Sequence, residues 1–363
     1  MESMAKAYDR FTVKEVESKS EWDKFLEVAE GATFFHSLEW RGFLAKMLDC
    51  RQFYLTVRNE VGELCGVFPS FVIGSNRFKA CVSLPLSDYG GPLTASREAG
   101  YALYWRLMEA CADMRISFVR LCLLEPFHIQ LFRSNLGCAD RGKGVVEIDL
   151  SRTDSSFVWN HVFSSVVRRK INRLKKLGLE AYELTSKCDL SEFYRIYAAD
   201  MKHIGVVPQT FSYLKTMWEM LYPKNLRIWL TGANKPFGGL LVLKDHKVSY
   251  TYFLGIDRTK SLSHPVFQYL VWSEILKAES EGLGKVSLGS TPADQGDTHH
   301  RIKRDTGGIF RLQEIAWIPT DSKGRLFLQI RGKVATLWRR SREYLPKETK
   351  SMIRALSKYT FNS

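Results

Sequence analysis

The 363-residue sequence contains no apolar run long enough to cross a membrane, since segments such as 118–124 and 237–243 are only strand-sized. Its seven cysteines are scattered, odd in number and never spaced as a CxxC pair. That pattern excludes a disulfide framework or a zinc knuckle and favours a reducing compartment. The first residues, MESMAKAYDR, lack the apolar core of a signal peptide. We therefore expect a cytoplasmic protein.

Several motifs of catalysis and cofactor binding are also absent. There is no GxSxG nucleophile elbow and no GxxxxGK[ST] phosphate loop, and no cysteine lies in an activating motif. His299 and His300 are adjacent, so their side chains diverge, and no His pair at i,i+4 supports a metal site. We expect no metal, no tightly bound cofactor and no covalent enzyme intermediate.

The composition indicates a folded protein with a strong and uneven positive charge. The apolar share is 45%, aromatics are 13%, and the length favours two domains. The net charge is +14, and residues 321–363 hold eleven Lys/Arg against three Asp/Glu. Residues 168–176 hold six cations and no acid. Such clusters favour nucleic acid, anionic lipid or a phosphorylated substrate, and a solvated basic face is the alternative.

The order of predicted elements is similar in the two halves. The first half predicts helices 20–30 and 37–48, strands 52–58, 63–73 and 77–84, helix 97–114, strand 116–124, a short helix after Pro126 and strand 145–150. The second half predicts helices 190–204 and 211–222, strands 226–231, 237–244 and 247–256, helix 265–281, strand 285–288, a loop and strand 310–317. Between them, 155–177 reads as a helix or helix pair carrying the basic cluster.

These patterns predict an α+β fold in which one unit occurs twice, each with a mixed, largely antiparallel twisted sheet flanked by helices. The expected domains are 1–152, 153–320 with the basic interdomain helix, and a basic amphipathic helical tail over 321–363.

Five segments carry a resemblance to a known family: TFFHSLEW (33–40), SLPLSDYGGPL (83–93), VRRKINRLKKLGLE (167–180), FLGIDRTKSLSHPVFQYLVWSEILKAESEGLGKVSLGS (253–290) and RIKRDTGG (301–308). Their order resembles the acyl-CoA N-acyltransferase (GNAT) superfamily. The duplicated unit resembles the Fem family of peptidoglycan-bridge aminoacyltransferases and the Fem-like acetyltransferases of exopolysaccharide and envelope loci. The resemblance extends to about residue 317 and does not include the tail.

Two departures from the family leave the donor open. No helical hairpin of the kind suspected of touching tRNA is inserted between residues 167 and 225. The loop DRTKSLSH (257–264) lacks the Gln/Arg-x-x-Gly-x-Gly/Ala pattern of ordinary CoA-dependent acetyltransferases. The resemblance thus implies acyl transfer, with either acyl-CoA or aminoacyl-tRNA as co-substrate.

Two residues are the candidates for catalysis. Lys303 lies between the last two predicted strands, where an ammonium can meet a phosphate or an oxyanion. The resemblance supports it, because a lysine of this segment is implicated in acyl transfer in the family; the alternative is a solvated turn. Asp257 follows a strand end and can accept a proton from an amine, or can merely cap a turn.

The substrate-binding candidates are less specific, and each also has a structural interpretation as a cap, turn, core or surface residue. His264, Gln268 and Tyr269 lie at the start of the predicted helix 265–281, where N–H groups attract an anion. Three other groups complete the set: Tyr89 and Gly90 in the first-half loop with His36 and Trp40, the basic residues Arg168, Arg169 and Lys170, and Arg301.

The sequence therefore predicts an N-acyltransferase that passes an acyl or aminoacyl group to an amine of a cell-envelope precursor, such as an amino sugar, a lipid-linked saccharide or a peptide stem. Direct attack by that amine is the expected mechanism. The basic tail is expected to meet an anionic membrane, at its inner face. The alternatives are a tRNA-dependent aminoacyltransferase, or a non-catalytic nucleic-acid or membrane adaptor on a transferase-like scaffold. The sequence specifies neither donor, acceptor nor oligomeric state.

Overall fold

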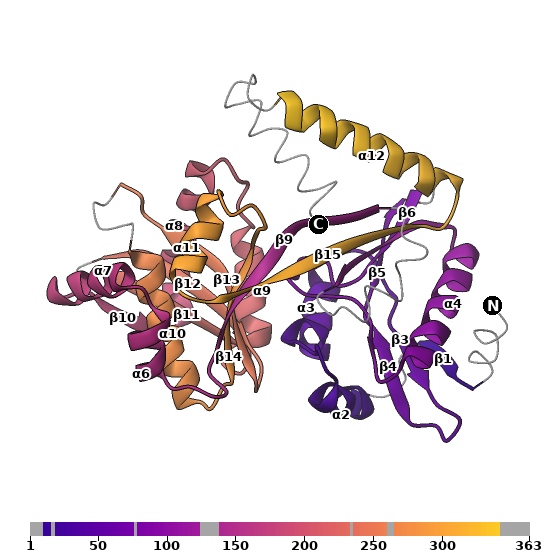
Figure 1. The fold of residues 1–363 in the computed structure, drawn as a ribbon, viewed down its shortest axis with the longest axis horizontal. Helices are drawn as coiled ribbons and strands as arrows, with labels where there is room; N and C mark the ends of the chain where they lie inside the picture. The colour runs from indigo at the N-terminus through magenta and orange to yellow at the C-terminus, as the bar shows by residue number, and fades with distance from the viewer. Residues whose placement is uncertain are drawn as a thin grey trace. The chain divides into compact units, whose positions relative to one another are not determined.

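A computed structural model describes residues 10–15, 19–75, 78–123, 138–232, 235–259 and 265–341, and for 138–141 and 332–341 it describes the backbone only. The described chain forms two compact units (Figure 1). Unit 2 is Lys143–Arg311, and unit 1 holds the described residues before it together with those from Leu312 onward. The expected divisions after 152 and 320 differ from these, because two long strands each pass from one unit into the other.

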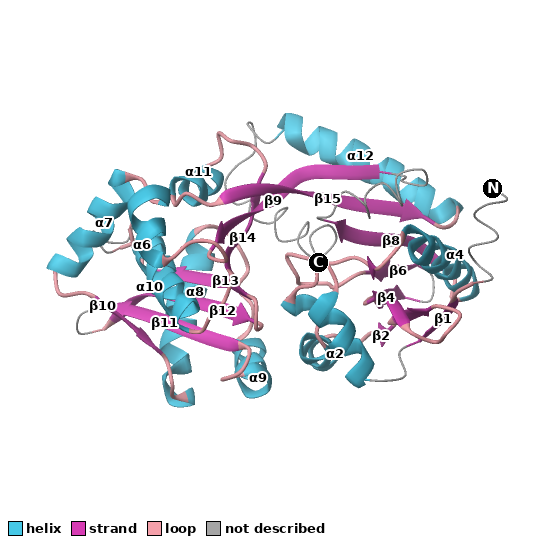
Figure 2. Cartoon of the chain, turned by 60° about the horizontal axis from the view of Figure 1, so that its bottom comes forward, coloured by secondary structure: helices cyan, strands magenta, loops and turns pink. Residues whose placement is uncertain are grey.

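Unit 2 is built on one mixed sheet. Its strands are β9 (Cys138–Asp149), β10 (Glu180–Glu183), β11 (Leu226–Gly232), β12 (Pro236–Lys244), β13 (Val248–Ile256), β14 (Lys285–Pro292) and the start of β15 (Ile309–Pro319). They lie in the order β10-β11-β12-β13-β14-β9-β15. In the described part of this unit, β13 and β14 pair in parallel, the other pairs from β10 to β9 are antiparallel, and β11, β12 and β13 run side by side (Figure 2).

Helices cover both faces of this sheet. They are α6 (Ser155–Phe157), a π-helix (Val158–Val162), α7 (Ser165–Lys176), α8 (Leu190–His203), α9 (Phe211–Leu221), α10 (Val266–Ser280) and α11 (Thr298–Asp305). Two glycines allow close packing on opposite faces. A Cβ at Gly238 would lie 2.3 Å from Val266 of α10, and a Cβ at Gly255 would lie 2.7 Å from the backbone of Tyr197 in α8.

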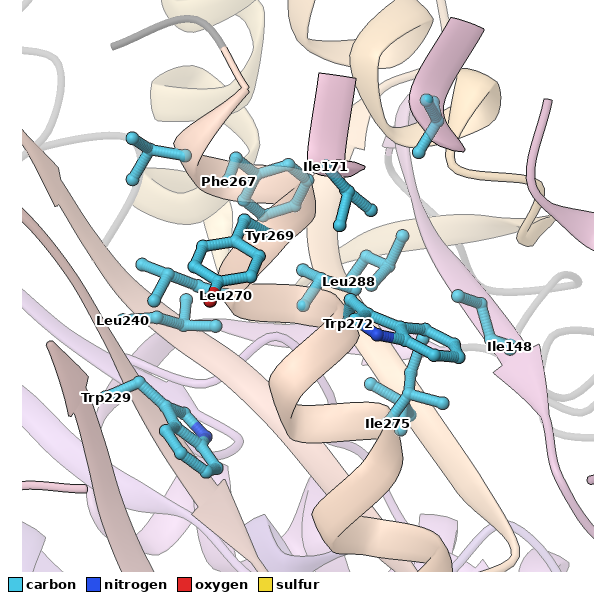
Figure 3. Close-up of a cluster of buried hydrophobic side chains, with 14 of the residues drawn as sticks. Ile148, Ile171, Trp229, Leu240, Phe267, Tyr269, Leu270, Trp272, Ile275 and Leu288 are labelled. Carbon is cyan, nitrogen blue, oxygen red and sulfur yellow. The ribbon is translucent and has the colours of Figure 1, made fainter. Parts of the chain in front are cut away.

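The core of unit 2 lies between α10, α7 and the sheet. Alternate positions of β12, Leu240 and Val242, face α10, whose Leu270, Val271 and Ile275 are buried against them (Figure 3). The apolar face of α7 joins the same core. This burial, roughly 25 cal/mol per Å² of apolar surface, fixes α10 against the sheet.

Unit 1 repeats the succession of two helices, several strands, a helix and a strand, with more and shorter strands between its helices. Its helices are α2 (Lys19–Val28), α3 (Leu38–Met47) after a 3₁₀ turn (Phe34–His36), α4 (Arg97–Asp113) and α12 (Ser322–Ser341). Its strands are β1 (Thr12–Glu15), β2 (Arg51–Gln52), β3 (Leu55–Arg58), β4 (Leu64–Phe68), β5 (Phe71–Ser75), β6 (Phe78–Val82), β7 (Leu93–Thr94), β8 (Ile116–Leu123) and the end of β15. They lie in the orders β1-β3-β4-β7 and β15-β8-β6-β5-β2, and β6 and β8 are parallel.

The predicted element order is confirmed, with local corrections. The expected strand 63–73 is two strands, β4 and β5, which belong to different sheets of unit 1. The expected loop before β15 is wrong, because residues 298–305 form α11. The short helix expected after Pro126 lies outside the described residues. In the expected tail 321–363 the structure describes one helix, α12, which ends at Ser341, and the chain after it lies outside the described residues.

Candidate functional site

The parallel strands β13 and β14 of unit 2 pair over three positions and then separate. The pairs are Val248–Lys285, Ser249–Val286 and Tyr250–Ser287. Both strands continue, to Ile256 and Pro292, with no further pairing between them in this fully described stretch. The two strands therefore open like a V toward their carboxyl ends, the end at which α/β sheets carry ligands.

A bulge in each strand produces this opening. On the β12 side, Leu241 pairs with Phe253 and Val242 with Thr251, which leaves Tyr252 as an extra residue in β13. On the β9 side, the register of β14 shifts between Ser287 and Ser290, and Gly289 there has a left-handed φ of 75°. Bulges bend strands and are frequent beside active sites.

The N-terminus of α10 follows this end of β13. Its N-cap is Pro265, and no side chain of the described residues caps its first turn. The first-turn residue Gln268 is 3% exposed, and its Oε1 has no hydrogen-bond partner among the described residues. A helix N-terminus favours an anion, and a buried acceptor without a donor favours an N–H or O–H group of a ligand.

Lys303 of α11 reaches the other side of the opening. Its Nζ donates a hydrogen bond of 2.8 Å to the carbonyl oxygen of Ser290, on the part of β14 that has left β13. The next residue, Thr291, is 2% exposed and its hydroxyl has no partner among the described residues. His300 anchors the same helix, since its Nδ1 lies 2.8 Å from the carbonyl oxygen of Pro292. The Lys303 ammonium is thus held at the β14 edge of the opening.

Asp200, which sequence reasoning did not single out, holds the end of β13. This α8 carboxylate is 2% exposed, and it accepts hydrogen bonds from the backbone N–H of Ile256 at 3.1 Å and from Nε of Arg258 at 2.5 Å. Asp257, between these two partners in the chain, accepts from the N–H and hydroxyl of Thr259 at 3.1 and 2.6 Å. Asp257 therefore caps a turn in this structure, and its catalytic role stays a prediction.

Aromatic side chains from α8, α9 and β13 form a wall on the α8 face near the bulge. The hydroxyls of Tyr213 and the bulge residue Tyr252 lie 3.2 Å apart, and the ring of Phe253 contacts those of Tyr197 and Tyr252. Burial raises the pKa of Tyr213 well above its usual range, opposed by the Tyr252 hydroxyl. Tyr213 therefore stays protonated and can act as a hydrogen-bond donor.

In unit 1, the loop 83–93 packs against the ends of the parallel pair β6 and β8. The Ser83 hydroxyl accepts from the N–H of Gly91 at 2.9 Å, and the side-chain amide of Gln313 donates to the carbonyl oxygen of Asp88. Gly91 has a left-handed φ of 108°, which favours glycine, and a Cβ there would also lie 2.6 Å from the Leu123 side chain of β8. The loop therefore packs closely against the ends of β6 and β8.

Four predicted site residues lie in this packed part of unit 1. Tyr89 is 5% exposed and stacks on Phe35, and Gly90 lies against Ser83. His36 is buried with its Nδ1 at 2.8 Å from the hydroxyl of Thr33, and Trp40 is fully buried. The buried Tyr89, His36 and Trp40 stabilise unit 1 in this structure, whereas Gly90 is partly exposed, and a substrate-binding role for the four stays a prediction.

Some of the remaining predicted residues form hydrogen bonds within unit 2, and others are exposed on its surface. Tyr269 lies among the buried side chains of unit 2 (Figure 3), and its hydroxyl donates to the carbonyl oxygen of Leu179. Arg168 donates to carbonyl oxygens of the π-helix and of Phe163, so it stabilises that segment. The exposed residues are Arg169, Lys170 and Arg301. His264 lies outside the described residues. Within the described residues no cluster of His, Cys, Asp or Glu could hold a metal ion.

No family model and no curated protein matches the sequence. Among solved structures, FemX superposes with a TM-score of 0.70 at 11% identity, covering 85% of this chain and 98% of FemX. The C-terminal domain of a putative lysylphosphatidylglycerol synthetase from Agrobacterium fabrum has a TM-score of 0.57 at 11% identity, covering 90% and 96%. A tandem GNAT protein from the clavulanic acid biosynthesis pathway has a TM-score of 0.53 at 11% identity, covering 86% and 98%.

These similarities cover nearly the full length of each neighbour, so they concern the paired units and not one of them alone. At such low identity they establish the fold. The predicted fold class is confirmed: the fold of this chain is similar to that of FemX and consists of two GNAT-like units.

Proposed function

We propose that the chain is an N-acyltransferase whose reaction takes place at the opening between β13 and β14 of unit 2. The observation that carries the proposal is the separation of these strands beside both the α10 N-terminus and Lys303. Unit 1 has its own loop packed at the corresponding strand ends, so the donor is assigned to unit 2.

An acyl donor of the CoA type fits the opening in two ways. An extended chain can pair with backbone groups of β13 that β14 no longer meets after Tyr250. The α10 N-terminus then faces the phosphate end of the donor, and the buried Gln268 oxygen accepts from a donor N–H.

Lys303 is the proposed group that stabilises the developing oxyanion. Attack of a neutral amine on the carbonyl carbon forms a C–N bond and moves negative charge onto the carbonyl oxygen. Collapse of that intermediate breaks the bond to the leaving group, which takes up a proton. Asp257 is our candidate to accept the amine proton, on condition that it releases its hydrogen bonds to Thr259.

The cysteines described in the interior are poor nucleophiles, in keeping with direct attack. Burial raises the pKa of Cys81 to about 12, and burial also raises the pKa of Cys111 far above its usual range. A thiol with so high a pKa supplies almost no thiolate at neutral pH.

For the acceptor we propose an amine of a cell-envelope precursor, and for the donor acyl-CoA, with aminoacyl-tRNA as the alternative. A donor and acceptor screen read by mass spectrometry tests this. Acetyl-CoA, longer acyl-CoAs and charged tRNAs would be paired with amino sugars, lipid-linked saccharides and peptide stems. We expect a mass increase of one acyl group on an amine acceptor. A screen without any acylated amine would contradict the proposal.

We further propose that the basic tail contacts anionic membrane. In the described part of α12, Leu326 and Ile330 are 57% and 52% exposed at i,i+4 spacing, beside the exposed Lys323 and Arg325. Leu328 on the inner side packs with Phe118 and Trp317 of unit 1. No helix of the described residues is both long and apolar enough to span a bilayer.

Charge reversal on this helix is expected to weaken that contact. For Lys323→Glu with Arg325→Glu, we expect binding to phosphatidylglycerol vesicles to fall by roughly tenfold or more, because each cation near an anionic surface contributes about 1 kcal/mol. Flotation with vesicles measures it. Full binding by this variant would remove the tail from the proposal.

A further inference from the structure

We propose that the outer face of α7 in unit 2 is a docking surface for anionic lipid. The surface comprises four cations and two apolar residues on one side of the helix: Val166, Arg169, Lys170, Arg173, Lys176 and Leu177. All six are exposed, and Val166 and Leu177 are 46% and 53% exposed. We call this set the α7 surface. The inference goes beyond the proposed reaction and does not depend on it.

The helical register places these side chains together. Arg169, Arg173 and Lys176 recur at i, i+4 and i+7, which is one stripe of an α-helix. The opposite stripe, Val167, Ile171 and Leu174, is buried in the core of unit 2. The helix is therefore held by its inner face, and its outer face is free to meet a partner without unfolding.

The charge of the α7 surface is not neutralised within the described chain. None of its four cations forms a salt bridge with a described residue, whereas other cations of unit 2 do, such as Arg195 with Glu192 at 3.0 Å. The sequence from His161 to Leu179 contains no acid. Uncompensated cations at this density favour a polyanionic surface.

The two apolar members favour lipid over nucleic acid. Val166 and Leu177 stand on the same side as the cations and offer no hydrogen bonds and no aromatic ring for a base. A helix that combines exposed apolar groups with cations suits the boundary between lipid headgroups and acyl chains, where both can be satisfied. RNA would use the cations alone.

The α7 surface belongs to the same unit as the opening between β13 and β14. The helix α7 packs into the core that also holds α10, whose N-terminus lies at the opening. An anionic membrane bound at α7 would thus keep unit 2 close to acceptors carried by lipid.

Vesicle binding of the full-length chain tests the inference without any turnover. The probe is vesicles of equal parts phosphatidylglycerol and phosphatidylcholine, with pure phosphatidylcholine as the uncharged reference. Arg169→Gln with Arg173→Gln is expected to weaken binding by about 25-fold, since each cation contributes about fivefold. The matched control, Lys202→Gln with Lys215→Gln, removes two exposed charges of α8 and α9 in the same unit and should leave binding unchanged.

A second variant separates lipid from RNA. Val166→Ser with Leu177→Ser keeps every charge, so it should weaken vesicle binding and leave binding to bulk tRNA unchanged. Equal losses of vesicle binding in the α7 charge variant and in its control, Lys202→Gln with Lys215→Gln, would overturn the inference. Wild-type binding by the α7 charge variant would also overturn it, and so would an unaltered chain that does not bind the vesicles. Loss of tRNA binding alone in the α7 charge variant would reassign the surface to RNA. Since all six side chains are exposed, unfolding midpoints should not move.

Discussion

Replacing Lys303 by methionine is expected to lower kcat for acyl transfer by about 10²–10³-fold with the fold intact, because the variant lacks the cation proposed to meet the oxyanion. Methionine keeps most of the aliphatic stem of Lys303, which is half-buried. The variant still loses the hydrogen bond from Nζ to the carbonyl oxygen of Ser290, so its unfolding midpoint has to be measured alongside its kinetics.

The split between kcat and KM distinguishes the proposed role from simple donor binding. An interaction made only in the transition state lowers kcat and kcat/KM together, whereas lost ground-state binding raises KM. We therefore expect an unchanged KM for the acyl donor. Steady-state kinetics on the donor and acceptor pair found in the screen would show this.

A neighbour on the same helix supplies the control. His299 of α11 is exposed, and its side chain is outside the proposed mechanism. His299→Ala should retain full activity. Full turnover by the Lys303 variant would remove the residue from the mechanism, and equal losses in both variants would indicate that α11 had merely been disturbed.

The helix around Lys303 shows what the sequence could and could not predict here. Residues 298–305 contain one aliphatic residue, Ile302, so the sequence shows no helical apolar period and indicates a loop. The structure agrees with that lack of a period, since only His300 of this helix is buried. The signal for a helix was its N-cap, because the Asp297 side chain accepts from the N–H groups of His299 and His300. Asp297 followed by eight residues without Gly or Pro is therefore the sequence pattern that indicates this helix.

The opening itself had weaker signals. The extra residue in β13, Tyr252, is defined by pairing with β12, and an uninterrupted apolar run does not reveal it. Gly289 was a signal for the bulge in β14, although the predicted strand ended one residue before it. Asp200 acts on Arg258, 58 positions later, and local patterns carry no such information. Elements were therefore predictable, whereas their distortions and long-range polar contacts were not.

Replacing Arg227 by methionine is expected to destabilise the chain by about 3–5 kcal/mol at neutral pH, because it leaves a buried carboxylate without its cation. Arg227 of β11 is 1% exposed, and its guanidinium donates to both oxygens of Glu274 at 3.0 and 3.1 Å. Glu274, in α10, is fully buried and also accepts from Nε1 of Trp229 at 2.7 Å. The pair ties α10 to the sheet whose far end forms the opening.

Arg227 also forms ion pairs with Glu183 and Glu281, whose side chains are 30% and 26% exposed, so the fully buried Glu274 should dominate the pH dependence of the cost. Burial raises the pKa of Glu274, and Arg227 and Trp229 oppose that rise. Without Arg227 the folded pKa rises further above the unfolded value of about 4.3, so the folded state binds more protons in this window. Stability of the variant then falls as pH rises through the window, and the deficit is larger at about pH 7 than at about pH 5.

Denaturant unfolding at both pH values measures the deficit against a surface control. Arg195 pairs with Glu192 at 3.0 Å, and the two side chains are 52% and 46% exposed. Arg195→Met should therefore cost at most about 1 kcal/mol, because exposed ion pairs contribute little. An Arg227→Met variant as stable as this control, or a deficit that does not change with pH, would show that Glu274 is not left as a buried charge. A confirmed deficit would mean that the ion pair secures α10, and with it the N-terminus that lies at the proposed donor site.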